Sequence, residues 1–120
     1  MSKFLAIYSF FSGFGLPAYE ENSVYATVPP LPYLTYEMKT DFFGNSVNFT
    51  CSLWYETPSW TEINRKTEEI SQKIGFGGII LDCDGGHIWL KRASPFAISM
   101  GDDLIKRKIL NFTAEFFTAD

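Results

Sequence analysis

The sequence predicts a single α+β domain, with two helices packed on one face of a mostly antiparallel sheet. The chain has 120 residues, the usual size of one domain. Hydrophobic residues make up 46% of it and aromatic residues 18%, which is enough for a packed core. Segments with a helical spacing of apolar residues alternate with segments that have the two-residue period of strands. The expected order over residues 1–120 is α-β-β-α-β-β-β.

The first helix is expected over residues 3–12. Ser2 can cap it, apolar residues recur at every third or fourth position, and Gly13 stands where a helix commonly ends. Residues 14–32 contain four prolines, so we expect no regular element there. A loop of this length is uncommon inside a compact domain unless it has a role such as reaching a neighbouring subunit.

Two alternating runs, residues 33–39 and 46–55, predict an antiparallel hairpin with its turn at residues 41–45. A second helix follows, because Ser59 and Glu62 match the S-x-x-E capping box. Its apolar stripe steps by three and four residues and consists of Trp60, Ile63, Thr67, Ile70 and Ile74.

The rest of the chain predicts three more strands. A strand that begins at Ile79 turns back through Asp84-Gly85-Gly86 into residues 87–92, which is typical hairpin chemistry. Residues 94–103 are expected to be irregular. The last strand, residues 104–117, alternates with Leu110, Phe112, Ala114 and Phe116 on one side.

Charge and cysteine content exclude several classes of protein. The 14 acidic and 10 basic side chains give a net charge of −4, which argues against wrapping of nucleic acid. One histidine and two distant cysteines are too few for a Cys/His zinc site. We expect Cys51 and Cys83 to be buried free thiols, with a disulfide as the alternative. No apolar run is long enough for a membrane helix, so we expect no membrane partner.

The one candidate for chemistry is the cluster Asp82, Asp84 and His87, which could hold a metal or form an acid/base site. The Asp-Gly-Gly sequence is more typical of a hairpin turn, because glycine readily adopts the positive φ that such turns need. No Ser/His/Asp or Cys/His arrangement is present. We therefore expect neither enzymatic activity nor a cofactor. A small-ligand-binding or enzymatic domain with a pocket at residues 82–87 remains the alternative from another class.

Several large apolar residues lie in loops or on the outward phase of strands. Aromatic residues in such places are typical of protein–protein contacts, although some could simply cover the second sheet face. The candidate subunit-interface residues are Phe14, Leu16, Tyr19, Tyr25, Trp54, Trp89 and Phe96.

Six strings spread over nearly the whole chain carry a family resemblance. They are residues 12–24 (SGFGLPAYEENSV), 32–36 (PYLTY), 52–55 (SLWY), 59–64 (SWTEIN), 89–96 (WLKRASPF) and 115–117 (EFF). With these strings the chain resembles the small tail-completion and tail-terminator-like minor tail proteins of long-tailed bacteriophages and prophages. It departs from them at residues 25–28 (YATV), where the family tends to place proline and acidic residues.

The resemblance implies a structural virion protein that assembles in the host bacterial cytoplasm. Such a subunit forms a ring, typically a hexamer, at the head-proximal end of the tail, where it terminates the tail tube and joins it to the head. Its implied partners are other copies of itself, the tail tube protein and head–tail connector proteins, and DNA passes through without specific binding. The alternative role is a head-side connector or minor capsid component.

Overall fold

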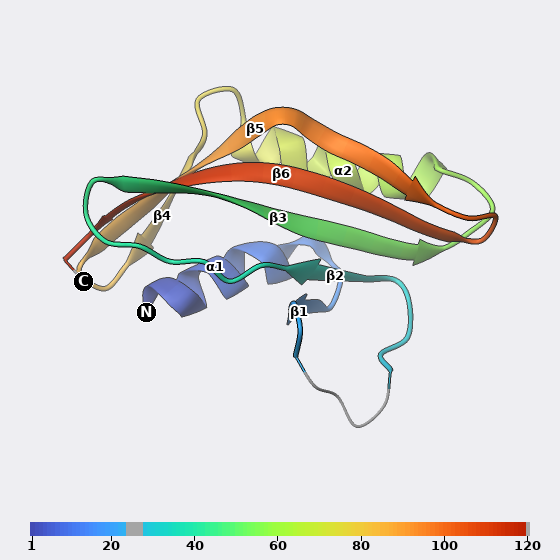
Figure 1. The fold of residues 1–120 in the computed structure, drawn as a ribbon, viewed down its shortest axis with the longest axis horizontal. Coiled ribbons are helices and arrows are strands. Elements are labelled where there is room, and N and C mark those ends of the chain that lie inside the picture. The colour runs from blue at the N-terminus through green and yellow to red at the C-terminus, as the bar shows by residue number, and fades with distance from the viewer. Residues whose placement is uncertain (24–27, 120) are drawn as a thin grey trace.

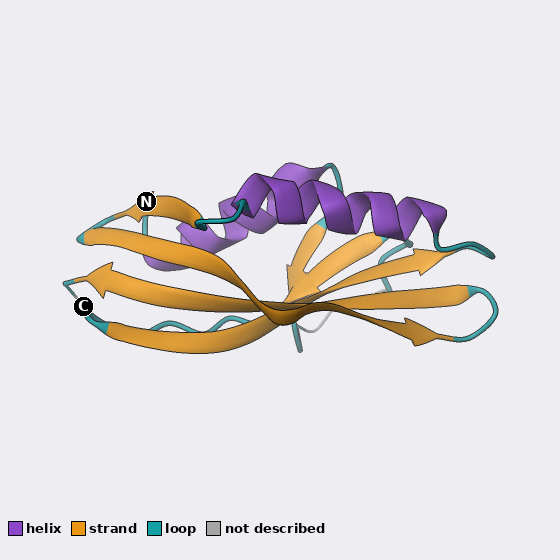
Figure 2. Ribbon diagram, turned by 90° about the horizontal axis from the view of Figure 1, so that it is seen from above, coloured by secondary structure: helices purple, strands orange, loops and turns teal. Residues whose placement is uncertain are grey.

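The computed structural model of the chain describes residues 1–23 and 28–119. Two helices lie on the same side of one curled six-stranded sheet, which confirms the predicted α+β class (Figures 1 and 2). The strand order in the sheet is β1-β2-β3-β6-β5-β4. In chain order the elements are α1 (Lys3–Phe11), the short 3₁₀ helix η1 (Ser12–Phe14), β1 (Ala18–Glu20), β2 (Tyr33–Tyr36), β3 (Asn45–Glu56), α2 (Thr61–Ile74), β4 (Ile79–Cys83), β5 (Gly86–Gly101) and β6 (Ile105–Thr118).

The long strands β3, β6 and β5 form the centre of the sheet. β3 pairs with β6 from Asn45↔Phe116 to Glu56↔Ile105 without a register shift. Along β6 every second side chain is buried, because successive side chains of a strand point to opposite faces. The sheet therefore has an inner face toward the helices and an outer face that neither α1 nor α2 covers (Figure 2).

The hydrophobic core lies between the inner face and the helices. Phe11 of α1 is fully buried, and its ring contacts those of Tyr36, Phe49 and Phe112 at centroid distances of 5.1, 6.2 and 5.6 Å. The predicted stripe of α2 is confirmed at its four buried positions, Ile63, Thr67, Ile70 and Ile74, whereas Trp60 is half-buried.

The helix starts differ in how well they were predicted. Ser2 caps α1 as expected, since its Oγ accepts a hydrogen bond from the Leu5 N–H at 3.1 Å. The prediction of a capping box at the start of α2 is wrong. The N-cap residue is Trp60, one position too late for the box, and the Ser59 Oγ accepts from the Thr61 N–H instead.

Residues 14–32 contain a strand, contrary to the prediction. β1 pairs with β2 in parallel, from Ala18↔Leu34 to Glu20↔Tyr36. The prolines of this segment flank β1 and leave its three residues free to pair. The Leu34 N–H also donates to the Pro17 carbonyl, so proline supplies an acceptor at the start of this pairing.

The prediction of an irregular segment at residues 94–103 is also wrong. β5 continues to Gly101, and a register shift between Arg92 and Ala97 takes up Pro95, which cannot donate to a sheet. The Asn111 side chain donates to the Pro95 carbonyl at 2.9 Å. The turn lies later, where the Asp102 carboxylate accepts hydrogen bonds from the Leu104 and Ile105 N–H groups.

Both cysteines are free, as predicted, but only Cys51 is buried. Its place on the inner face of β3 raises the pKa of its thiol, chiefly because burial disfavours the thiolate. Cys83 is half-buried, because β4 is an edge strand with neighbours on one side only. In the described part of the chain, no helix is both long and apolar enough to cross a membrane.

Candidate functional site

A row of large side chains crosses one end of the outer sheet face. The strand register places Tyr33 of β2 opposite Trp54 of β3, Trp54 opposite Arg107 of β6, and Arg107 opposite Met100 of β5. Directly paired residues point to the same face, so these side chains are neighbours. Tyr19 of β1 extends the row, with its ring centroid 5.7 Å from that of Tyr33. We call Tyr19, Tyr33, Trp54, Arg107 and Met100 the outer row.

Polar contacts fix the central members of the outer row. The Trp54 Nε1–H donates to the Thr35 Oγ1 at 2.9 Å, and the ring centroids of Trp54 and Tyr33 are 6.4 Å apart. The Arg107 guanidinium lies over the Trp54 ring, 4.5 Å from its centroid, and its Nε–H donates to the buried Ser52 Oγ at 3.1 Å. Arg107 takes part in none of the ion pairs found among residues 1–23 and 28–119. The row is therefore preorganised, and it retains a positive charge for a partner.

A pocket of about 560 Å³ lies between the outer row and the chain that flanks it. Its apolar walls come from aromatic rings of the row and from Val28 and Pro29, and Glu20 and Glu21 add carboxylates. Tyr, Trp and Arg are the residue types that most often dominate binding energy at protein interfaces. We call this cavity the aromatic pocket and define it by Tyr19, Val28, Pro29, Tyr33, Trp54 and Arg107.

The middle of the outer face is polar and internally paired. The Thr113 Oγ1 donates to the Asn48 Oδ1 at 3.0 Å, and Lys91 and Glu115 form an ion pair at 3.7 Å. These cross-strand pairs satisfy one another without a partner protein. We call Asn48, Thr113, Lys91 and Glu115 the polar strip, and the directly paired Ile98 and Ile109 lie between it and the outer row.

The opposite end of the outer face is aromatic again. Phe42 and Phe43, in the turn that leads into β3, are 62% and 67% exposed. The Phe43 ring contacts Phe117 at 5.7 Å, and Phe117 contacts His87 at 5.1 Å. Two aromatic regions therefore lie near the two ends of β3, and the polar strip is part of the face between them.

The structure brings two of the predicted interface residues together, Tyr19 and Trp54. Trp89 lies elsewhere on the outer face, where its Nε1–H donates to the Gly77 carbonyl at 2.8 Å. Phe96 is half-buried and packs on Phe112 of the core, with ring centroids 5.6 Å apart. Tyr25 lies outside the described residues.

Phe14 and Leu16 were wrongly predicted as interface residues. They are only 5% and 9% exposed and belong to the core. The physical reason is η1, which continues α1 and ends at Gly15 with a φ of 77°, so that the chain folds back and the Phe14 ring packs on Phe10 at 5.2 Å. Spacing alone could not show this reversal.

Sequence reasoning missed Tyr33, Met100 and Arg107, as well as the exposed pair Phe42 and Phe43. Strand alternation assigns Arg107 to a face of its own strand. It does not show which strand lies next to it. Exposed phenylalanines in a turn were the one available signal for the other end of the face.

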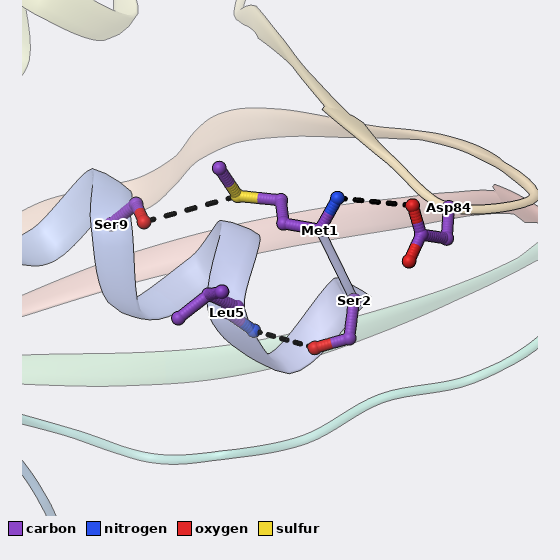
Figure 3. A network of polar contacts seen from close by, with 5 residues as sticks. All are labelled: Met1, Ser2, Leu5, Ser9 and Asp84. Carbon is purple, nitrogen blue, oxygen red and sulfur yellow. Dashed lines mark hydrogen bonds and ion pairs between the residues drawn. The ribbon is translucent and has the colours of Figure 1, made fainter.

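The cluster at residues 82–87 forms the predicted turn between β4 and β5. The amino terminus binds it, with the Met1 nitrogen 3.0 Å from the Asp84 Oδ1 (Figure 3). Asp82 and His87 are a directly paired couple of the hairpin. No group of three or more His, Cys, Asp or Glu side chains suited to a metal ion occurs among the residues that the structure describes.

Comparison of the chain with models of known protein families, with curated proteins and with solved structures gave no match.

Proposed function

We propose that this chain is a structural subunit of a tailed bacteriophage or prophage, which forms a ring with other copies, terminates the tail tube and joins it to the head. The observation that carries the proposal is the aromatic end of the uncovered sheet face. An antiparallel sheet with one face in water usually carries polar side chains there. Here that face carries a preorganised row that includes Tyr33, Trp54 and Arg107.

The strings that resemble tail-completion proteins supply much of the aromatic pocket. Tyr19 comes from the string at residues 12–24, Tyr33 from 32–36 and Trp54 from 52–55. The resemblance and the geometry thus favour the same end of the molecule as a contact surface.

A closed ring of identical subunits that meet head to tail needs two different complementary patches on each copy. The outer face offers an aromatic pocket at one end and exposed phenylalanines at the other. Six copies, the tail tube protein and the head–tail connector proteins as partners follow from the resemblance. The net charge of −4 suits a ring through which DNA passes without being held.

The test is assembly of this chain with a tail tube protein from the same phage or prophage. Light scattering after size exclusion measures the mass of the subunit alone and in the mixture, and electron microscopy shows the ends of the tubes. We expect rings at one end of tubes that have stopped growing. A subunit that binds no tube and leaves polymerisation unchanged would refute the terminator role, and rings bound to the head-side portal instead would indicate the connector role.

A matched pair of variants tests whether the aromatic pocket is needed for ring formation in this assay. Arg107→Gln removes the positive charge from the outer row, whereas Arg65→Gln removes one from an exposed position on α2. We expect loss of rings with the first variant and normal rings with the second. Equal effects of the two variants would show that the outer row is not the contact surface.

A further inference from the structure

The turn before β3 presents two phenylalanine rings to solvent in a fixed geometry. The Asp41 carboxylate accepts from the Phe42 N–H at 2.8 Å, and the Asp41 carbonyl accepts from the Lys3 Nζ at 3.0 Å. The Gly44 N–H donates to the Phe116 carbonyl, and Gly44 has the positive φ of 86° that the turn needs. We call Phe42 and Phe43, held in this way, the phenylalanine knob.

An ordered knob of this kind is suited to binding. Exposed large apolar groups that lie together mark contact sites, and a turn already held by hydrogen bonds loses little conformational entropy when it docks. Phe43 contacts Phe117 and is still 67% exposed, and Phe42 is 62% exposed, so both rings project into solvent. The knob therefore needs an apolar receptor with room for one or two phenyl rings.

The aromatic pocket has the matching properties. Its volume of about 560 Å³ falls within the range of pockets that enclose small ligands. Tyr19, Tyr33 and Trp54 provide ring edges and faces for aromatic packing. Arg107, Glu20 and Glu21 also line the pocket, and the positive charge of Arg107 is complementary to the negative face of an incoming ring.

The knob cannot reach the pocket of its own copy. β3 begins at Asn45, next to the knob, and reaches the pocket at Trp54. Nine residue steps at about 3.3 Å each separate the two by about 30 Å along the strand. The receptor for the knob must therefore be on another molecule.

We propose that Phe42 and Phe43 of one copy insert into the aromatic pocket of a second copy. The contact joins two different patches, so it is head to tail and can close into a ring. This inference rests on the proposed ring assembly and names the surfaces that form it.

The experiment uses two variants that each break one side of the contact. Phe42→Ser with Phe43→Ser removes the knob. Val28→Glu places a carboxylate on an exposed wall of the pocket. A phenyl ring that entered the pocket would remove water from this carboxylate, which is unfavourable. Phe76→Ser is the matched control, since Phe76 is fully exposed elsewhere on the molecule. Thermal unfolding checks that all variants are folded.

Sedimentation velocity measures self-association at protein concentrations up to about 1 mM, so that a contact with a Kd as weak as about 1 mM is detected. We expect the wild type and Phe76→Ser to associate alike, and each broken variant to associate at least about tenfold more weakly, a change of about 1.4 kcal/mol. An equal mixture of the two broken variants retains one intact knob and one intact pocket. It should form a heterodimer and nothing larger.

Three results would overturn the contact: no association of the wild type up to about 1 mM, wild-type association by the knob variant, or no heterodimer in the mixture. Failure of the contact is distinguishable from failure of the proposed function. Rings on tail tubes with the knob variant would refute the contact and keep the function. A heterodimer together with a wild type that never binds tail tubes would keep the contact and refute the function.

Discussion

Replacing Phe11 with alanine tests the core arrangement that holds the outer face in place. Phe11 is 0% exposed and contacts four other aromatic rings, those of Phe10, Tyr36, Phe49 and Phe112. Truncation of a buried phenylalanine costs about 3–5 kcal/mol. For 120 residues the unfolding entropy is about 0.25 kcal/mol per degree, so the expected fall in Tm is roughly 12–20 °C.

The same helix provides the control. Phe4 is 51% exposed, so Phe4→Ala should change the free energy of unfolding by no more than about 0.5 kcal/mol. Both variants are measured by urea unfolding and by calorimetry at low protein concentration, so that assembly does not contribute. A cost below about 1 kcal/mol for Phe11→Ala, or similar costs for both variants, would show that α1 packs on the sheet through another face.

Three further predictions follow. The free energy of unfolding should fall as the pH rises above about 8.5, because burial raises the pKa of Cys51 and the folded chain keeps a proton that the unfolded chain releases. Urea unfolding from pH 7 to 10 should show a decline of at most about 1.4 kcal/mol per pH unit from this group, absent in Cys51→Ala, and parallel curves for the two proteins would contradict it. Thiol titration of denatured, unreduced protein should find two reactive groups, Cys51 and Cys83, whereas none would indicate a disulfide. Replacing Tyr19 and Tyr25 with serine should preserve stability and abolish tail completion, and normal completion would exclude an assembly role for residues 14–32.

The sequence correctly predicted the elements in which buried side chains recur at a regular spacing over many residues. The apolar stripe of α2 and the alternating burial along β6 are such patterns, and the structure confirms both. The failures share a different cause. β1 has three residues and exists through pairing with β2, while β5 passes Pro95 because β6 pairs on both sides of the register shift. These are effects of tertiary pairing that override local propensity.

The same effect of tertiary pairing explains why only part of the candidate site was predicted. Tyr19 and Trp54 were recognised because one is an aromatic residue in an expected loop and the other lies on the outward phase of an expected strand. Arg107 was not, since the residue that fixes it, Ser52, is 55 positions away. Only the register of β3 on β6 brings these side chains together.

The polar strip between the two aromatic ends bears on how copies can meet. If two copies stacked their outer faces directly, the Lys91–Glu115 ion pair and the Asn48–Thr113 hydrogen bond would be taken out of water. Burial of such charges costs free energy that a flat polar contact does not recover. Contacts confined to the ends avoid this cost, so these two polar pairs disfavour a face-to-face dimer and are compatible with the head-to-tail contact that a ring requires.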